Sequence, residues 1–350
     1  MKTIKYSDLQ KLIYDSLVAA GLEDEQAQIT TDHMAYADIH GTDTHGIMRL
    51  PIYVKRLTAN VINKKPNYQI LNETSNSLNI DADNGMGHYF TDMAMKKAIE
   101  KAKENTIGFV TVKNGNHFGA LAPYSRLAAE ENMIGFITTN AAPLMAPPGG
   151  AERMIGNNPV SFAVPRKDKS PLILDMALSK VAGGKLVLAS KKGEDIPLGW
   201  ALDNQGKPTT DPYEGFENNG ILLPIGGHKG YGLSLVMDIL AGVLSGAKYG
   251  KSVNRLYDTT QPLGSGHAVL VLNINNLMNL EEFYERLEDY FTEILSAKTT
   301  EDGKIMIPGD IEAETAKTRE SEGIPLPDKL WDELEEMLED LNLSKSNYGF

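Results

Sequence analysis

Strand-like and helical segments alternate through the middle of the chain, and this pattern limits the fold more than any other feature. The two kinds of pattern take turns at residues 68–71, 77–80, 93–103, 108–112, 121–131 and 134–138. Further apolar runs follow at residues 160–164, 172–174 and 267–273. Such alternation is typical of helices that pack against a sheet. The sequence therefore predicts an α/β (α+β) fold.

Both ends of the chain are mainly helical. Apolar residues recur at helical spacing over residues 9–17, and an amphipathic, acidic pattern covers residues 328–343. We predict a helical domain built from both ends, with a central α/β domain between them. The expected boundaries are residues 1–70 plus 297–350 for the helical domain, and 71–296 for the central domain.

Composition excludes several classes of protein. The chain has 350 residues, of which 41% are hydrophobic, so it can bury a sizeable core. It carries 47 acidic against 34 basic residues, and a net charge of −13 makes nucleic acid and anionic membranes unlikely partners. Cysteine is absent, which excludes disulfides, thiolate metal ligands and a cysteine nucleophile. With a polar N-terminus and no long apolar stretch, we expect a soluble, cytoplasmic protein.

The first candidate for chemistry is the segment from Thr44 to Tyr53. His45, Arg49 and Tyr53 are each four residues apart, so a continuous helix would place them on one face. A guanidinium fork beside an imidazole and a phenol could hold a 2-keto or 2-hydroxy carboxylate. The alternative interpretation is a surface turn in which Arg49 only makes a salt bridge.

The second candidate is the loop Asn116-His117-Phe118-Gly119. It follows a predicted strand and precedes a predicted helix, a position at which α/β enzymes commonly keep catalytic residues. A histidine there can transfer protons near neutral pH. An ordinary loop histidine that bonds only its neighbours is the alternative.

The third candidate is the glycine-rich segment 224–232, in which Lys229 stands at the start of an apolar helix. Glycine-rich backbone and a lysine at a helix N-terminus favour an anion. The spacing does not match a Walker A loop, and neither 85–87 nor 230–232 completes a G-x-G-x-x-G motif. A Rossmann fold is therefore not predicted.

Other chemistries have weaker support. No H-E-x-x-H pair and no G-x-S-x-G elbow occurs, so neither a metal site nor a serine hydrolase is predicted. Two alternatives stay open at this point. One is a lyase or hydrolase that uses His45 and Asp43 on a metal, and the other is a carboxylate-binding protein without catalysis.

Several short motifs occur together in one order. They are Thr44-His45-Gly46 followed by Arg49, Asn116–Gly119, Gly156-Asn157-Asn158-Pro159, Asp175-Met176-Ala177 and Gly226–Leu233. Residues 196–201 and 208–212 extend the similarity over nearly the whole chain. With this ordered set the chain resembles the malate/L-lactate dehydrogenase family, which is distinct from the Rossmann-type lactate and malate dehydrogenases. The family also includes ureidoglycolate, sulfolactate and diketogulonate oxidoreductases.

The resemblance implies a non-Rossmann fold with a mixed sheet, and an NAD-dependent oxidoreductase, with NADP possible. The substrate would be a 2-hydroxy or 2-keto acid of the malate or lactate type, with ureidoglycolate or another family substrate as the alternative. By similarity His117 is the acid/base residue, with His45 as a second candidate. Arg49 would hold the substrate carboxylate, assisted by Thr44 and Tyr53.

The resemblance also implies a cofactor site in the central domain, and a homodimer. The positions that carry over as cofactor-binding are Ala141, Asp175, Met176, Ala177, Lys229, Pro308, Gly309 and Asp310.

Overall fold

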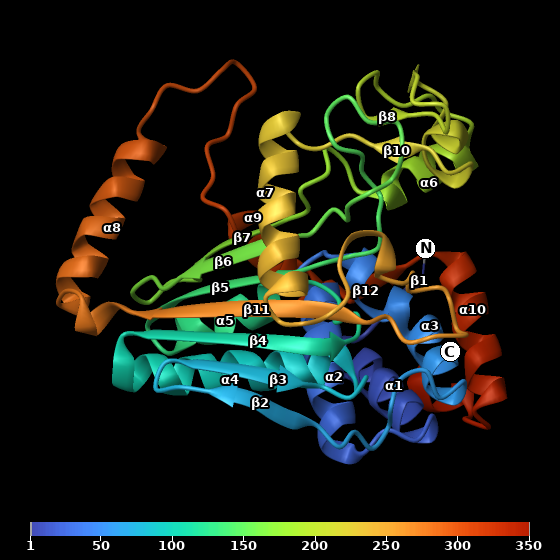
Figure 1. Ribbon diagram of the computed structural model, residues 1–350, viewed down its shortest axis with the longest axis horizontal. Coiled ribbons are helices and arrows are strands. Elements are labelled where there is room, and N and C mark those ends of the chain that lie inside the picture. The colour runs from blue at the N-terminus through green and yellow to red at the C-terminus, as the bar shows by residue number, and fades with distance from the viewer. Residues whose placement is uncertain (1, 350) are drawn as a thin grey trace.

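A seven-stranded sheet forms the centre of the computed structural model, which describes residues 2–349 (Figure 1). Its strand order is β2-β3-β4-β11-β5-β6-β7. The strands are β2 (Gln69–Glu73), β3 (Ser77–Asp81), β4 (Ile107–Gly115), β11 (Ser265–Asn273), β5 (Met133–Thr139), β6 (Val160–Val164) and β7 (Leu172–Met176).

The sheet is mixed, as the resemblance implied. β3 and β4 pair in parallel, joined by the crossover helix α4 (Gly87–Asn105), whereas β11 runs antiparallel to both β4 and β5. A Rossmann fold needs a largely parallel sheet, so the missing glycine fingerprint agrees with the topology. The predicted α/β class is therefore confirmed.

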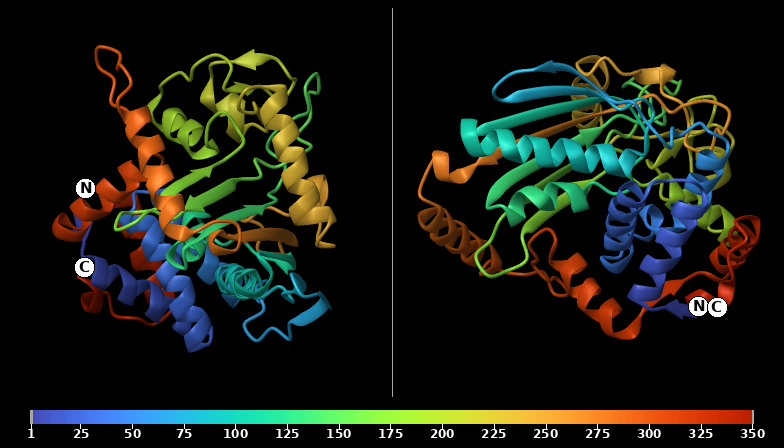
Figure 2. Two further views of the ribbon diagram at one scale, coloured as in Figure 1. Left: turned by 90° about the vertical axis from the view of Figure 1, so that its left-hand side faces the viewer. Right: turned by 90° about the horizontal axis from the view of Figure 1, so that it is seen from below.

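Helices cover both faces of the sheet (Figure 2). On one face α4 and α5 (Ala122–Glu130) bury Phe90, Met95 and Tyr124 against strand residues such as Val110 and Ile137. On the other face α7 (His228–Asp238) continues into a π-helical turn at Ile239–Val243. Strand side chains alternate between the two faces, so each face acquires its own apolar layer.

The two ends of the chain pack on each other to form a helical layer. Strand β1 (Lys2–Ile4) pairs antiparallel with β12 (Ile324–Leu326), and both termini lie at this end of the molecule (Figure 2). Leu12, Leu17, Trp331 and Leu334 share one buried core. The helices of this layer are α1 (Tyr6–Ala19), α2 (Asp24–Ile39), α3 (Leu50–Thr58) and α10 (Asp328–Asp340). The division at residues 70 and 297 stays a prediction.

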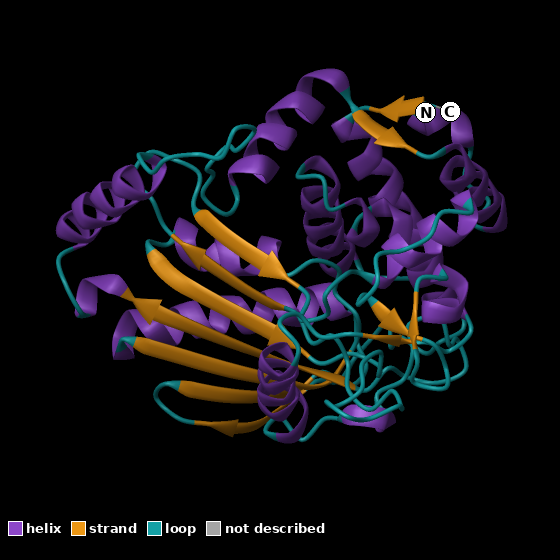
Figure 3. Ribbon diagram, turned by 90° about the horizontal axis from the view of Figure 1, so that it is seen from above, coloured by secondary structure: helices purple, strands orange, loops and turns teal. Residues whose placement is uncertain are grey.

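A small lobe and two outer helices complete the fold (Figure 3). The lobe has a three-stranded sheet and its own core, which includes Met145, Leu186 and Leu222. Its elements are α6 (Gly183–Lys192), β8 (Ala201–Leu202), β9 (Pro208–Thr209) and β10 (Ile221–Leu222), and the outer helices are α8 (Leu280–Leu295) and α9 (Asp310–Glu322). Within residues 2–349, no helix combines the length and the apolar character that crossing a membrane requires.

Candidate active site

The segment from Asp43 to Arg49 is not a continuous helix, so His45, Arg49 and Tyr53 do not share one helical face. It forms two 3-10 turns, Asp43–His45 and Ile47–Arg49, and the α-helix α3 begins only at Leu50. Gly46 separates the turns at φ −95° and ψ −136°, which is neither helical nor extended backbone. Pro51 stands in the first turn of α3, where its missing N–H costs nothing.

A buried carboxyl group from α2 shapes this turn. Asp38 Oδ2 accepts a hydrogen bond from the Ile47 N–H at 2.7 Å, and burial raises the pKa of Asp38 well above its usual value. A Cβ on Gly46 would lie 2.1 Å from Asp38 Oδ1, so only glycine fits. Arg319 of α9 also pairs with Asp43 and donates to the Asp38 carbonyl. The turn is thus fixed from two sides.

Replacing Gly46 with alanine is expected to destabilise the protein by on the order of 2–4 kcal/mol, because the methyl group collides with the Asp38 carboxyl. Urea unfolding measures the effect. Gly232→Ala is the matched control, since nothing lies within 4 Å of a Cβ placed there in α7, and alanine suits a helix. Equal stability of the two variants would contradict the proposed clash.

Arg49 is held at two points of its guanidinium. Its Nε donates to the Thr44 carbonyl at 2.7 Å, and Nη1 donates to the hydroxyl of Tyr257. These bonds leave the remaining N–H groups of Nη1 and Nη2 side by side for a carboxylate. The small lobe faces the same turn, because a Cβ on Gly184 in α6 would stand 4.0 Å from Thr44 Cγ2.

His117 follows the end of β4, as predicted. Its neighbour Asn116 is buried and donates from Nδ2 to the carbonyls of Asn84 (2.8 Å) and Gly85 (2.9 Å), which fixes the loop. His117 Nδ1 lies 2.6 Å from the hydroxyl of Tyr53. The fold therefore joins the second motif to the end of the first.

The rings of His45 and His117 stack with 5.8 Å between their centroids and 17° between their planes. Burial lowers the pKa of His45 to about 4, and burial with the nearby His45 lowers that of His117 well below its usual value. Burial raises the pKa of Tyr53 above its usual value. All three groups are therefore neutral in the free protein at neutral pH.

Tyr53 is the most buried member of this cluster, since the residue is only 1% exposed. The Tyr53 hydroxyl and the Gly119 N–H, which donates at 3.2 Å, both lie on His117 Nδ1, so the second ring nitrogen, Nε2, is left for a reacting group. The position of Tyr53 suits a residue that orients His117.

The positions expected to bind cofactor gather around β7 and the start of α7. The Ala141 N–H donates to Asn158 Oδ1 at 2.9 Å, and Asn158 Nδ2 donates to the Ser234 carbonyl of α7 at 2.9 Å. Directly after Met176 and Ala177, Leu178 bonds Ile225, which brings the glycine-rich turn beside the end of β7. Gly226 and Gly227, at φ 59° and 63°, open the helix in which Lys229 is exposed.

The turn Pro308-Gly309-Asp310 lies against the outer edge of the sheet. The Ile173 N–H in β7 donates to the Pro308 carbonyl at 3.0 Å. Asp310 Oδ2 accepts from the Ile307 N–H at 3.0 Å, which closes the turn before α9. The structure thus places this turn in contact with the strand that carries Asp175.

Asp175 connects the cofactor positions to the histidine loop. Its Oδ2 accepts hydrogen bonds from the N–H groups of Leu121 (2.9 Å) and Ala122 (2.8 Å) at the start of α5. Burial raises the pKa of Asp175 to about 6, although these two hydrogen bonds lower it. Asp175 thus links β7 to the start of α5, the helix that follows the His117 loop.

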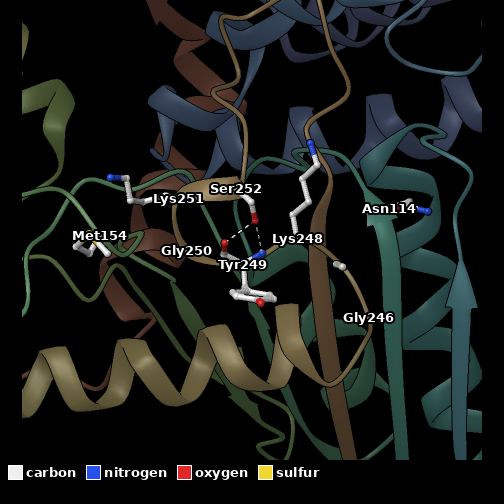
Figure 4. A pocket seen from close by; sticks show the side chains of 9 residues that line it. Asn114, Met154, Gly246, Lys248, Tyr249, Gly250, Lys251 and Ser252 are labelled. Atoms are coloured by element: carbon white, nitrogen blue, oxygen red, sulfur yellow. Dashed lines mark hydrogen bonds between the residues drawn. The ribbon is translucent and has the colours of Figure 1, made fainter.

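The geometry does not support a metal site that uses His45 and Asp43. Asp43 is paired with Arg319, and no group of three or more potential metal ligands exists within residues 2–349. A separate open hollow lies on the loop 246–252, where Ser252 Oγ bonds both backbone groups of Tyr249 (Figure 4). None of the predicted site residues lines this hollow.

The comparisons with known proteins agree with the fold. A family model described as malate/L-lactate dehydrogenase matches residues 4–335. The malate dehydrogenase of Pyrococcus horikoshii is 42% identical over 92% of this chain and 90% of its own. A structure of the sulfolactate dehydrogenase from Methanocaldococcus jannaschii has a TM-score of 0.94 and 37% identity over the full length of both chains. An Escherichia coli protein named ureidoglycolate dehydrogenase (NAD(+)) is 33% identical over 94% of this chain and 93% of its own.

The molecule is thus a dehydrogenase-type α/β protein with a non-Rossmann sheet. The chain belongs to the malate/L-lactate dehydrogenase family.

Sequence reasoning missed several residues of the site. Asp38, Arg56, Tyr257 and Arg319 shape it, yet no short motif contains them. Gly87 was noted only as part of an incomplete fingerprint. In the structure a Cβ there would lie 2.3 Å from the Asn116 carbonyl, so this glycine lets α4 approach the His117 loop.

Proposed function

We propose that the protein is a nicotinamide-dependent dehydrogenase that interconverts a 2-hydroxy acid of the malate type and its 2-keto acid. The observation that carries the proposal is the contiguous set Arg49, His45, His117 and Tyr53, with an oriented cation beside a neutral imidazole pair. A 2-keto acid presents a carboxylate next to its reacting carbonyl, and this arrangement offers one group for each.

Each residue has a separate task in this proposal. Arg49 binds the carboxylate and fixes the orientation of the adjacent carbon. Oxidation uses the His117 tautomer that has its proton on Nδ1, donated to the Tyr53 oxygen; Nε2 then takes the hydroxyl proton, and it returns this proton during reduction. Tyr53 keeps Nδ1 occupied and thereby fixes the direction of the ring. His45 stacks on His117 and is the second candidate for proton transfer.

The residues around β7 fit a nicotinamide dinucleotide. Nothing lies within 4 Å of a Cβ on Gly227, and the exposed Lys229 stands in the first turn of α7, so a diphosphate has both space and positive charge. Ala141, Met176, Ala177 and the turn 308–310 would line the same cofactor. When bound, this cofactor supplies or accepts the hydride. We propose NAD, with NADP as the alternative.

A substrate-by-cofactor activity matrix tests the proposal. Oxaloacetate, pyruvate and sulfopyruvate are each assayed for oxidation of NADH and NADPH at 340 nm, and ureidoglycolate is assayed for reduction of NAD⁺. We expect the highest kcat/KM for oxaloacetate with NADH. If no 2-keto or 2-hydroxy acid is turned over with either cofactor, the proposed activity is wrong.

We also propose a homodimer that forms through α7. Leu233, Val236, Ile239, Val243 and Leu244 lie on α7 and the turn after it, and each is between 46% and 55% exposed. A continuous apolar surface of this kind is typical of a protein interface.

Ile239→Lys is therefore expected to convert the dimer to a monomer, because it places a charge in the interface. Light scattering after size-exclusion chromatography measures the mass. Leu277→Lys is the control, since Leu277 is 68% exposed and lies away from α7, in the connection before α8. A monomeric wild-type protein would contradict the proposal.

A further inference from the structure

A closed loop, residues 254–263, covers the Arg49 side of the site, and we call it the strap. The backbone N–H of Asn254 donates to the Leu263 carbonyl at 3.1 Å, and Asn254 Nδ2 donates to the Pro262 carbonyl at 2.6 Å. These bonds join the two ends of the strap. A loop closed in this way holds its tip in a defined place.

Arg56 of α3 holds the strap in place through hydrogen bonds to its backbone. This side chain is fully buried, and its guanidinium donates to the carbonyls of Leu256 (3.2 Å), Asp258 and Gln261 (3.3 Å). Bonds from a charged donor are stronger than neutral ones, and three of them fix one short segment. Arg56 lies seven residues after Arg49, so the helix that follows Arg49 also positions the strap above it.

The tip of the strap is ordered by Asp258. Its Oδ1 accepts hydrogen bonds from the N–H and hydroxyl of Thr260, and its Oδ2 accepts from Gln261 Nε2. The hydrogen bonds from Thr260 and Gln261 lower the pKa of Asp258 to about 2, so this carboxylate stays ionised at neutral pH. The backbone on one side of Tyr257 is therefore fixed independently of any ligand.

Tyr257 reaches from the strap to Arg49. Its hydroxyl accepts a hydrogen bond from Arg49 Nη1, and the guanidinium carbon lies 5.7 Å from the centre of its ring. The ring is 67% exposed, so this contact is not an incidental result of core packing. With Nε bound to Thr44, the Tyr257 contact is the second point that sets the orientation of the fork.

We propose that Tyr257 is a positioning residue that aligns Arg49 with the substrate carboxylate. Without the phenol, the guanidinium keeps one anchor at Thr44 and can rotate about its Cδ–Nε bond, which turns the Nη1–Nη2 edge away from the carboxylate. The inference rests on the proposed function, because it takes Arg49 as the carboxylate-binding group. It assigns substrate positioning to a strap 208 positions further along the chain.

Tyr257→Phe tests the inference, since it removes the hydroxyl and keeps the ring. The dissociation constant of oxamate, a carboxylate that mimics a 2-keto acid, is measured by calorimetry in the presence of saturating NADH. We expect it to rise about tenfold, with a loss of kcat/KM for the keto acid of about tenfold or more. Affinity for NADH should stay within about twofold of wild type. Tyr290→Phe is the matched control, because Tyr290 is 58% exposed on the outer helix α8.

A double-mutant cycle with Arg49→Lys shows whether Tyr257 acts through Arg49. We expect the double variant to bind oxamate no more than about threefold worse than Arg49→Lys alone, because lysine has no fork to align. Unchanged oxamate binding by Tyr257→Phe, or full multiplication of the two losses, would overturn the inference. Oxamate binding without turnover of any keto acid would overturn the proposed function alone, whereas a wild-type protein that turns over a keto acid but does not bind oxamate would overturn the inference alone.

Discussion

Replacing His117 with alanine is expected to lower kcat by about two to four orders of magnitude while NADH binding persists. The imidazole follows the end of β4, with Nδ1 held by the Tyr53 hydroxyl and Nε2 left for the substrate oxygen. Alanine leaves no group there to carry the proton. Steady-state kinetics and a fluorescence titration with NADH on the same preparation measure the two effects.

His45→Ala is the matched comparison, because the two rings stack and both are neutral at rest. If His117 transfers the proton, His45→Ala should lose less activity than His117→Ala. Near-wild-type turnover in His117→Ala, with an inactive His45→Ala, would instead transfer the role to His45. The assignment between the two histidines is thereby decided by one pair of variants.

Because His117 is neutral in the free protein, oxidation and reduction of the substrate place different demands on its protonation state. Oxidation of a hydroxy acid needs an unprotonated ring nitrogen, and burial keeps the imidazole unprotonated to lower pH than in a free histidine. Reduction needs a proton on the ring, and the negative charge of a bound 2-keto acid favours that protonated form. Substrate binding and proton uptake are therefore coupled at the same residue.

The strands were the most predictable part of the fold. Residues 160–164 form β6 as predicted, because a buried apolar run between turns has few other structures available. The pair β1–β12 was not predicted, since three-residue strands 320 or more positions apart leave no periodic pattern. Helix α9 was also missed. It has no buried side chains and is held partly by Arg319, which bonds a distant turn.

Residues of the candidate site could be predicted where they lie close together in the sequence. His45, Arg49 and Tyr53 come together although no continuous helix joins them, because two 3-10 turns and the first turn of α3 also advance the chain in tight turns. Tyr257 could not be found in this way. Its contact with Arg49 depends on the closure of the strap and on Arg56, and both are properties of the tertiary structure.

Arg49→Lys is expected to lower kcat/KM for 2-keto acids by about ten- to a thousandfold, although it keeps the positive charge. Lysine cannot offer two parallel N–H groups to a carboxylate, and it loses the bond from Nε to the Thr44 carbonyl. A misoriented carboxylate also displaces the carbonyl from His117, so the transition state loses more than the ground state. Cofactor affinity should change little, because the positions expected to hold the cofactor lie around β7 and α7.

The same variant also tests whether Arg49 is merely structural. A structural arginine would lower the melting temperature on substitution and leave normal kinetics in the protein that stays folded. A carboxylate-binding arginine predicts the reverse, since Arg49 is only half-buried and its bonds join a turn that Asp38 and Arg319 already fix. Melting temperature and kcat/KM measured on one preparation distinguish the two. An unchanged kcat/KM in a stable Arg49→Lys protein would show that the substrate carboxylate is bound elsewhere.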